Sequence, residues 1–418
     1  MDSFEYRNNR LHCENVLLSE VAKEFGTPTY VYSRDAIELA YLEYANALVG
    51  RDDDMVCFAI KANSNLAVLD ILARLGAGFD VVSQGELDRV LKAGGRADRV
   101  VFSGVSKQSR EIRRALEVGI HCFNIESEAE LERIDAVAGQ MGMIAPISFR
   151  VNPNVDAGTH PYISTGLKEN KFGVAIDDAE RIYLRAKSLS NVEITGMDCH
   201  IGSQLTELAP FMDALDKLLI LVDQLQAQDI TIKHLDLGGG LGVCYTDEVP
   251  PKPGDYIAAV LEKIGDRDLN LVFEPGRSIV ANAGVLITEV EYLKHNESKN
   301  FAIVDAAMND MLRPALYSAY LDILPTEINE DNTAHSYDIV GPVCETGDFL
   351  GKDRTLSIEA GDILAVCSSG AYGFTMSSNY NTRTRAAEVM IDDNQMYEIR
   401  ARETFEDLIK GEKLLPKG

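Results

Sequence analysis

Two residues that could do chemistry directly follow short apolar segments of the sequence. Lys61 follows a run that ends at Ile60, and His200 follows a run that ends at Cys199. A lysine amine that is partly removed from water loses pKa and becomes a nucleophile towards aldehydes. An imidazole offers a flat face on which an aromatic ring can stack. Taken alone, a solvated lysine and a structural histidine remain the competing interpretations.

Two further segments combine glycine with charge. Gly238-Gly239-Gly240 is followed by Val243 where a dinucleotide fingerprint would have glycine or alanine, so that fingerprint is absent. Three glycines still leave backbone N–H groups open to a phosphate, although a tight turn is an equal alternative. In Glu274-Pro275-Gly276-Arg277, the carboxylate could face a ligand cation while Gly276 and Arg277 bind an anion. A structural Glu–Arg salt bridge is the alternative.

The elements that must position these residues form a repeating pattern. Short β-branched or apolar runs alternate with amphipathic helical stretches from residue 54 onward. The predicted strands are Met55–Ile60, Phe79–Val82, Val100–Phe102, His121–Ile125, Ile147–Val151, Val192–Cys199, Ile232–Leu237 and Leu269–Phe273. Eight strands favour a (β/α)8 TIM-type barrel over an open doubly wound sheet, which usually stops near six strands. The candidate residues then gather where barrel enzymes place their chemistry, at the carboxyl ends of the strands.

The alternation of predicted strands and helices ends after Asn282. Val290 and Tyr292 alternate with acidic residues, and Tyr397 and Ile399 alternate with Glu398 and Arg400. This period of two predicts half-buried antiparallel strands. We therefore expect an α/β protein of two domains. Residues 34–281 form the barrel, and residues 1–33 plus 282–418 form a second, mainly antiparallel β domain.

Composition narrows the possible partners. With 40 Lys+Arg against 66 Asp+Glu, the formal net charge of −26 disfavours nucleic acid and anionic membrane surfaces. No amino-terminal targeting segment or long apolar run is evident, so we expect a cytoplasmic protein. The seven cysteines are scattered without a Cys-x-x-Cys pair and fit neither a disulfide framework nor a zinc site, so no metal is predicted.

An amine nucleophile, a stacking imidazole, a phosphate cradle and a carboxylate at one end of a barrel together describe a pyridoxal 5'-phosphate site. At this point the chain resembles the diaminopimelate decarboxylases, barrel-type (fold type III, alanine racemase-like) pyridoxal phosphate enzymes. The motifs that carry the resemblance are Lys61-Ala62-Asn63, Asp80-Val81-Val82-Ser83, Gly85-Glu86-Leu87, Lys171-Phe172-Gly173, His200-Ile201-Gly202-Ser203-Gln204, Gly238-Gly239-Gly240, Glu274-Pro275-Gly276-Arg277, Arg313-Pro314-Ala315-Leu316-Tyr317, Gly341-Pro342-Val343-Cys344-Glu345 and Gly370-Ala371-Tyr372-Gly373. Their order and spacing are specific, although Ser368-Ser369 and Thr384 depart from the usual family pattern.

The resemblance implies decarboxylation of meso-2,6-diaminopimelate to L-lysine and CO2, the last step of lysine biosynthesis. It implies that Lys61 binds the cofactor covalently, that Glu274 keeps the ring nitrogen protonated and that Cys344 acts as a proton donor. The implied cofactor-binding residues are Lys61, His200, Ser203, Gly238, Gly239, Gly240, Glu274, Gly276, Arg277 and Tyr372, and His200 is also counted as catalytic. The implied substrate-binding residues are Arg277, Arg313, Tyr317, Glu345 and Tyr372.

The resemblance also implies a homodimer whose active sites are shared between subunits, acting on a small amino acid without nucleic acid or membrane partners. Three alternatives stay open at this level. They are an ornithine- or arginine-type decarboxylase, an amino acid racemase, and a noncatalytic homologue that regulates a decarboxylase.

Overall fold

The computed structural model describes residues 3–156 and 171–417, which fall into two compact units. One unit comprises residues 38–244 and 248–279, and the other comprises residues 1–37, 245–247 and 280–418. Every helix within the described ranges is too short or too polar to span a bilayer. The two units are described separately below.

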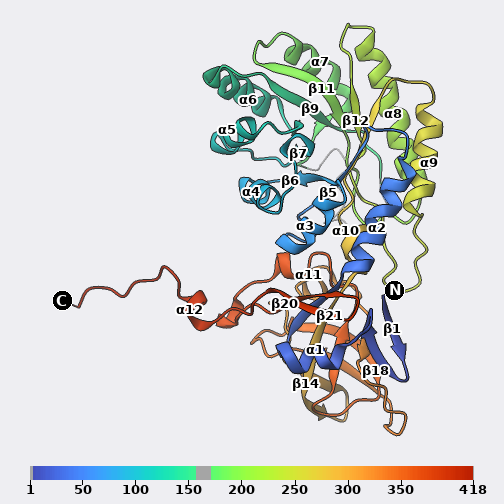
Figure 1. Cartoon of the computed structure of the whole chain (residues 1–418), viewed down its shortest axis with the longest axis vertical. Helices are drawn as coiled ribbons and strands as arrows, with labels where there is room; N and C mark the ends of the chain where they lie inside the picture. The colour runs from blue at the N-terminus through green and yellow to red at the C-terminus, as the bar shows by residue number, and fades with distance from the viewer. Residues whose placement is uncertain (1–2, 157–170, 418) are drawn as a thin grey trace. The chain divides into compact units, whose positions relative to one another are not determined.

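The first unit is a closed barrel of eight parallel strands, which confirms the predicted fold class (Figure 1). The strands in order around the barrel are β5 (Met55–Ala59), β6 (Gly78–Val81), β7 (Val100–Phe102), β8 (Cys122–Ile125), β9 (Ala145–Asn152), β11 (Val192–Asp198), β12 (His234–Asp236) and β13 (Asn270–Phe273). Pairing of β13 with β5 closes the ring, and the short β10 (Val174–Ala175) adds to β9. The eight strands predicted from the sequence are thus all present.

Helices alternate with these strands and cover the outside of the barrel (Figure 1). They are α2 (Arg34–Ala47), α3 (Leu66–Arg74), α4 (Gln84–Lys92), α5 (Ser109–Val118), α6 (Glu128–Met141), α7 (Ile176–Lys187), α8 (Ala209–Gln226), α9 (Pro253–Ile264) and α10 (Arg277–Val280). In α8 apolar residues recur at three- and four-residue spacing, and the buried ones include Phe211, Leu215, Leu218, Leu219, Val222 and Leu225. This spacing places them on one stripe of the helix, as the sequence predicted.

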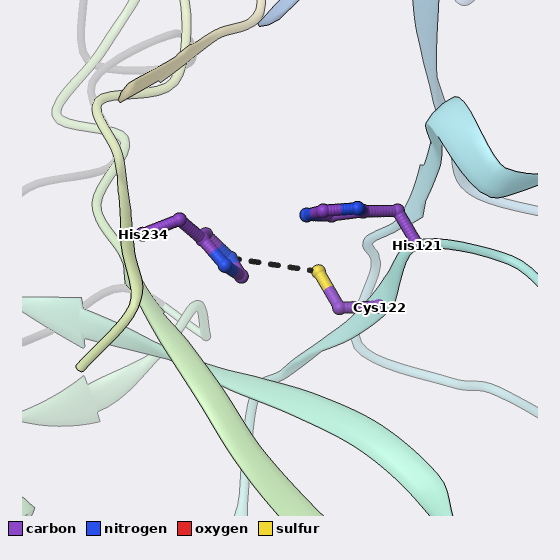
Figure 2. Close-up of side chains that lie close together, drawn as sticks. All are labelled: His121, Cys122 and His234. Carbon is purple, nitrogen blue, oxygen red and sulfur yellow. Dashed lines mark hydrogen bonds between the residues drawn. The ribbon is translucent and has the colours of Figure 1, made fainter. Parts of the chain in front are cut away.

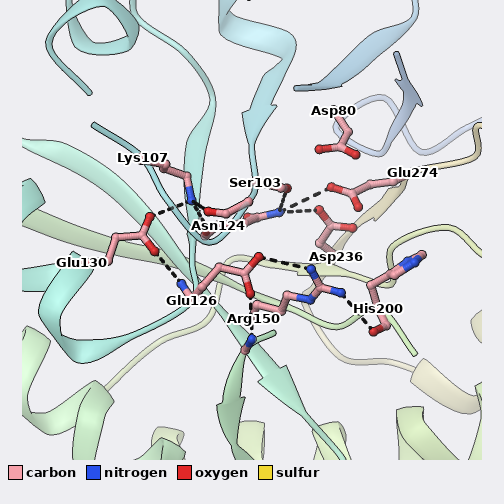
Figure 3. A network of polar contacts seen from close by, with 12 residues as sticks. Asp80, Ser103, Lys107, Asn124, Glu126, Glu130, Arg150, His200, Asp236 and Glu274 are labelled. Atoms are coloured by element: carbon pink, nitrogen blue, oxygen red, sulfur yellow. Dashed lines mark hydrogen bonds and ion pairs between the residues drawn. The ribbon is translucent and has the colours of Figure 1, made fainter. Parts of the chain in front are cut away.

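Side chains inside the barrel are stacked in layers because alternate residues of each strand face inward. On β8 the inward pair is Cys122 and Asn124, and on β12 it is His234 and Asp236. Cys122 contacts His234 in the lower layer (Figure 2), and Asn124 bonds Asp236 in the upper layer (Figure 3). The upper layer lies towards the carboxyl ends of the strands, where the candidate residues are.

The second unit is built mainly on antiparallel strands. Its nine-stranded sheet contains β4 (Thr29–Ser33), β14 (Gly284–His295), β15 (Asn300–Val304), β16 (Ile323–Pro325), β17 (His335–Val340), β18 (Phe349–Leu356), β19 (Ile363–Val366), β20 (Ala387–Asp392) and β21 (Gln395–Arg400). A small sheet of β1 (Phe4–Arg7), β2 (Arg10–Cys13) and β3 (Val16–Leu17) precedes them, and the helices are α1 (Leu18–Phe25), α11 (Arg313–Tyr317) and α12 (Phe405–Leu408).

Two aromatic residues of this unit differ from the sequence prediction. Tyr292 is 67% exposed and Tyr397 is 52% exposed, so the predicted half-burial is wrong at both positions. On β14 the pairing register shifts between Val290 and Tyr292. Such an irregularity changes the face to which the following side chains point, and the sequence alternation does not reveal it.

A buried ion pair anchors the loop before α5 to the barrel. The Nζ of Lys107 donates to Glu130 Oε1 at 2.7 Å and to the carbonyl oxygens of Asn124 and Gly104 at 2.6 and 2.9 Å (Figure 3). Glu130 Oε2 in turn accepts from the backbone N–H of Glu126 at 2.9 Å. Both side chains of the pair are nearly inaccessible to solvent, so neither charge has water as a substitute partner.

We expect Lys107→Ala to lower the free energy of unfolding by about 3–5 kcal/mol, because it leaves the Glu130 carboxylate buried without its cation. Lys107→Met combined with Glu130→Gln should recover much of this loss, since no charge is then left alone. Urea unfolding monitored by circular dichroism measures the unfolding free energy of the single and the double variant. Lys233→Ala is the matched control, because Lys233 pairs with Glu193 at the exposed surface and should cost no more than about 1 kcal/mol. An equal loss in Lys107→Ala and Lys233→Ala would contradict this account.

Candidate active site

Lys61 lies just beyond the end of β5, as predicted, and faces the neighbouring strand. Its Nζ donates to Asp80 Oδ2 at 2.5 Å. Asp80 is on β6 and is buried, and its second oxygen, Oδ1, has no hydrogen-bond partner among the described residues. Asp80 belongs to the Asp80-Val81-Val82-Ser83 motif but is not among the predicted site residues. The structure thus adds a buried carboxylate directly beside the predicted nucleophile.

Glu274 follows β13 and belongs to a cluster of buried acids. Carboxylate oxygens of Glu274, Asp198 and Asp236 lie within 4.8 Å of one another. The Nδ2 of Asn124 donates to Asp236 Oδ2 at 3.3 Å and to Glu274 Oε1 at 3.4 Å (Figure 3). Burial raises the pKa of Glu274 and of Asp198 well above the usual range, and it raises the pKa of Asp236 to about 7. These acids therefore retain protons unless a cation is brought close to them.

Arg150 is the buried cation on the other side of this cluster. Its Nη1 lies 3.2 Å from Glu126 Oε1, and its Nη2 donates to the carbonyl oxygen of His200 at 3.3 Å. The guanidinium also lies over the ring of Phe172, 4.7 Å from the ring centre, within one of the motifs quoted above. Arg150 thus ties the backbone of His200 to β9 and partly offsets the acidic charge.

The ring of His200 has a fixed orientation. Its Nδ1 accepts a hydrogen bond from the backbone N–H of Gly239 at 3.1 Å. Burial lowers the pKa of His200 well below its usual range, with further lowering by Arg150 and Lys61, so the ring is neutral. A neutral ring held at one edge can present its face to an aromatic ligand.

The sequence predicted that the glycine run leaves its backbone N–H groups open to a ligand, but two of the three are already engaged. Gly238 donates to Asp236 Oδ1 at 2.9 Å and Gly239 donates to His200, so the expectation of three open donors is wrong for these two. Instead, the absence of side chains permits close approach of the backbone. A Cβ on Gly239 would lie only 2.2 Å from the carbonyl oxygen of Glu274. The glycines therefore allow the ends of β12 and β13 to meet beside His200.

A guanidinium and a hydroxyl are paired at the same end of the barrel. The Nε and Nη2 of Arg277 donate to Ser203 Oγ at 3.2 and 3.0 Å. Arg277 follows Gly276, whose missing side chain leaves room for Ala59 and Ala62. A hydroxyl beside a guanidinium suits a phosphate or a carboxylate.

The remaining predicted residues belong to the second unit. Arg313 and Tyr317 begin and end α11, and the guanidinium of Arg313 stacks on Tyr245 at 4.9 Å from the ring centre. Cys344 is exposed, and its backbone N–H donates to Asn381 Oδ1 at 2.8 Å. The neighbouring Glu345 accepts a hydrogen bond from the hydroxyl of Tyr380 at 3.3 Å, and Tyr372 has a left-handed backbone with φ of 56°. Tyr380 was not among the predicted site residues.

The barrel residues fit pyridoxal phosphate. The unpartnered Oδ1 of Asp80 and the acids around Glu274 outnumber the nearby cations Lys61 and Arg150, so the cluster can accept the positive charge of a protonated ring nitrogen. Lys61 supplies the amine, the neutral His200 ring supplies a stacking face, and Ser203 with Arg277 can hold an anion.

Comparison with known proteins agrees with this site. The family model described as "Pyridoxal-dependent decarboxylase, pyridoxal binding domain" matches residues 34–281, which are more than half of the chain. The fold and the site therefore define a barrel-type, pyridoxal phosphate-dependent carboxy-lyase. The chain belongs to the diaminopimelate decarboxylase family of these enzymes, which confirms the resemblance seen in the sequence.

Three relatives illustrate the similarity. The diaminopimelate decarboxylase of Pseudomonas aeruginosa is 64% identical over 100% of both chains, and that of Haemophilus influenzae is 58% identical over 98% of both. The crystal structure of the Helicobacter pylori diaminopimelate decarboxylase complexed with L-lysine is 45% identical, with a TM-score of 0.90 over 94% of this chain and 98% of that one.

A pH-dependent contribution to stability comes from Glu86, at the amino-terminal end of α4. Its Oε2 accepts from the backbone N–H of Val82 at 2.6 Å. Burial raises the pKa of Glu86 to about 7, against the lowering effect of the Val82 N–H. Because the folded-state pKa exceeds the unfolded value of about 4.3, the folded state binds more protons between these two values. The stabilisation is complete below about pH 4 and is lost as the pH rises through 7.

We therefore expect Glu86→Gln, which keeps an acceptor for Val82, to flatten the fall in unfolding free energy between about pH 4 and pH 7. The difference between variant and unmodified chain should reach up to about 3 kcal/mol across this window. Urea unfolding of the chain without added cofactor at several pH values measures it. Glu128→Gln is the control, because Glu128 lies in the first turn of α6 with a side chain 42% exposed. If Glu128→Gln flattened the pH dependence of the unfolding free energy as much as Glu86→Gln does, Glu86 would have no special role.

Proposed function

We propose that this chain removes CO2 from meso-2,6-diaminopimelate and releases L-lysine, the last step of lysine biosynthesis. The observation that carries the proposal is the amine of Lys61 beside the buried acids Asp80 and Glu274, in a chain 64% identical over its full length to a diaminopimelate decarboxylase. L-Lysine bound to the Helicobacter pylori relative supports the assignment of the product.

The barrel residues would hold the cofactor in a defined orientation. When bound, pyridoxal phosphate supplies a ring that accepts the electron pair left by departing CO2. Lys61 would provide the amine for the cofactor's aldehyde, and Glu274 would favour a protonated ring nitrogen. A carboxylate about 4 Å from that nitrogen stabilises the positive charge by roughly 4 kcal/mol at an effective dielectric of 20, which is enough to keep the proton at neutral pH. His200 covers one face of the ring.

The phosphate would be held at the other end of the cofactor. Ser203, Gly276 and Arg277 offer a hydroxyl, a close backbone approach and a guanidinium for it. Gly238, Gly239 and Gly240 keep this part of the barrel free of side chains. Arg277 can serve either the phosphate or a substrate carboxylate.

The second unit would supply the groups that act on the substrate. Cys344 donates the proton that replaces CO2, and Tyr372 contacts cofactor and substrate. Diaminopimelate carries a second complete amino acid group, whereas ornithine carries only an ammonium at that end. Arg313 and Tyr317 suit the distal carboxylate, and Glu345 suits the distal ammonium. A site with charges for both groups, of which Arg313 is buried, should reject ornithine and L-lysine by orders of magnitude, because those charges would be left unpaired.

The decisive assay mixes the purified protein and pyridoxal phosphate with meso-diaminopimelate, ornithine, arginine or L-lysine in parallel, and measures CO2 and amine products. Release of CO2 with L-lysine from diaminopimelate alone supports the proposal. Equal kcat/KM for ornithine and diaminopimelate would favour the basic amino acid decarboxylases instead. Substrate epimerisation without CO2 would favour a racemase, and no turnover with any of them would favour a regulatory homologue.

Lys61→Ala should abolish the visible absorbance of covalently attached cofactor and lower kcat by several orders of magnitude, because no other amine replaces Lys61 at the end of β5. Absorbance spectroscopy of the purified variant with pyridoxal phosphate measures the first effect. Lys107→Met with Glu130→Gln serves as a control for general disturbance of the barrel, since it keeps Lys61 in place. An unchanged cofactor spectrum in Lys61→Ala would reject the assignment.

We also propose a homodimer in which Cys344 and Glu345 act at the barrel of the neighbouring subunit, a feature implied by family resemblance. An isologous dimer then contains two shared sites. The exposed apolar side chains of the second unit, including Tyr292, Tyr397 and Phe405, are consistent with a surface that another subunit covers. The predicted cytoplasmic location remains a prediction.

Mixing inactive Lys61→Ala with inactive Cys344→Ala should restore activity if the sites are shared. Half of randomly mixed dimers contain one subunit of each kind, and each such dimer has one intact site, so about a quarter of the native activity is expected. Two different affinity tags on the variants verify that subunits have exchanged. Exchange without recovered activity would mean that each site is built within one subunit.

A further inference from the structure

The lower layer of the barrel holds three soft ligand groups that the proposed reaction does not use. Atoms of His121, Cys122 and His234 able to bind a metal lie within 4.8 Å of one another (Figure 2). Cys122 Sγ is 3.7 Å from His234 Nε2, and the two imidazole rings are 5.0 Å apart with planes inclined at 54°. Cys122 and His234 come from β8 and β12, which have β9 and β11 between them in the barrel.

The backbone makes room for this group. His234 pairs with Gly196 on β11, and a Cβ at Gly196 would lie 2.1 Å from His234 Nε2. The register of β11 shifts between Ile194 and Gly196, just where the ring is accommodated. An ordinary apolar layer of a barrel is filled by branched side chains. Here a glycine and an irregular strand leave the space to an imidazole.

The hydrogen bonding of His121 is what a metal ligand requires. One ring nitrogen interacts with the backbone of Asp98, and the buried Nε2 has no hydrogen-bond partner among the described residues. A histidine that binds a metal commonly gives its other N–H to a backbone carbonyl, which fixes the ring and leaves the lone pair available. A buried nitrogen left without a partner otherwise weakens the fold.

The charge state of the two histidines also suits a cation. Burial lowers the pKa of His121, and it lowers that of His234 to about 3, so both rings are neutral and keep a lone pair. Burial, followed by Asp236, Asp198 and Glu274 in the layer above, raises the pKa of the Cys122 thiol, so an incoming metal ion must displace the thiol proton. Arg99 lowers the pKa of His121 further and would repel a cation, and Asp98 partly offsets this effect.

We propose that His121, Cys122 and His234 form a binding site for a soft divalent cation, with Zn²⁺ as the preferred ion. With bonds of about 2.3 Å to sulfur and about 2.05 Å to nitrogen, a tetrahedral zinc places its S and N ligands about 3.6 Å apart, close to the separation of Cys122 and His234. A thiolate with two imidazoles selects Zn²⁺ over Mg²⁺ or Ca²⁺. Binding releases the thiol proton of Cys122 to solvent and forms the S–Zn bond, and a water completes the fourth position.

Such an ion would link opposite sides of the barrel below the upper layer. It lies outside the site of the proposed reaction, so its loss should affect stability before chemistry. This site has no sequence signature, because its three ligands come from two separated segments without a metal-ligand spacing.

The test uses the holoenzyme, treated with a chelator and then titrated with Co²⁺, which reports thiolate ligation by its absorbance. A difference spectrum against untitrated holoenzyme removes the cofactor contribution. We expect one equivalent of Co²⁺ to develop a thiolate-to-cobalt band that Zn²⁺ displaces, and Zn²⁺ to raise the unfolding temperature. Cys122→Ser should lose the band, whereas Cys367→Ser, which changes a buried thiol of the second unit, should keep it.

His121→Gln provides a second variant in case Cys122→Ser fails to fold, because His121 is only partly buried. It should weaken Co²⁺ binding by more than about tenfold, since even changes outside the ligand shell have that effect. A band that persists in Cys122→Ser or is unchanged in His121→Gln would place the ion on the exposed thiols Cys244 or Cys344 and overturn the proposal. Absence of any band in the native holoenzyme would also overturn it, leaving a hydrogen-bonded core pair.

Discussion

The excess of buried negative charge in the upper layer of the barrel is the constraint on which the rest depends. Asp80, Asp198, Asp236 and Glu274 lie around the strand ends, with Lys61 and Arg150 as the nearby cations. Burying carboxylates without compensation is costly, so burial raises the pKa of Asp198 and Glu274 and favours their protonated forms. A ligand that brings positive charge into the cluster relieves this cost. The stability of the barrel and its affinity for a protonated ring are thus two consequences of one arrangement.

The strands can tolerate this charge because a polar network fixes the surrounding loops. Glu126 accepts the N–H of Gly173 at 2.7 Å and contacts Arg150, while its own N–H is held by Glu130, the partner of Lys107 (Figure 3). These hydrogen bonds hold Glu126, Glu130 and Arg150 in place around the acids. Rigid placement is what makes an electrostatic site effective, since little reorganisation is left for the reaction.

The sequence predicted the strands and the residues at their ends better than those within them. Lys61, His200 and Glu274 directly follow apolar runs, so their position on the barrel rim follows from strand boundaries alone. Asp198 and Asp236 are the last residues of β11 and β12, but they lie inside the longer strands predicted from the sequence, Val192–Cys199 and Ile232–Leu237, where the pattern does not reveal which side faces inward. Their contacts with Asn124 and Glu274 depend on the register between strands far apart in the chain. The irregularities at Gly196 and Val290 likewise have no sequence signature.

The two units supply different kinds of specificity. The barrel offers a surplus of carboxylates for a cationic ring, whereas the second unit offers both signs, with Arg313 stacked on Tyr245 and Glu345 held by Tyr380. Stacking fixes the plane of a guanidinium before a carboxylate arrives, so less side-chain entropy is lost on binding. The proposed site, with Arg313 and Glu345, would present a cation and an anion to a substrate end that carries both charges. A ligand with only an ammonium there would leave the guanidinium uncompensated, which is why charge balance, more than size, would separate diaminopimelate from ornithine.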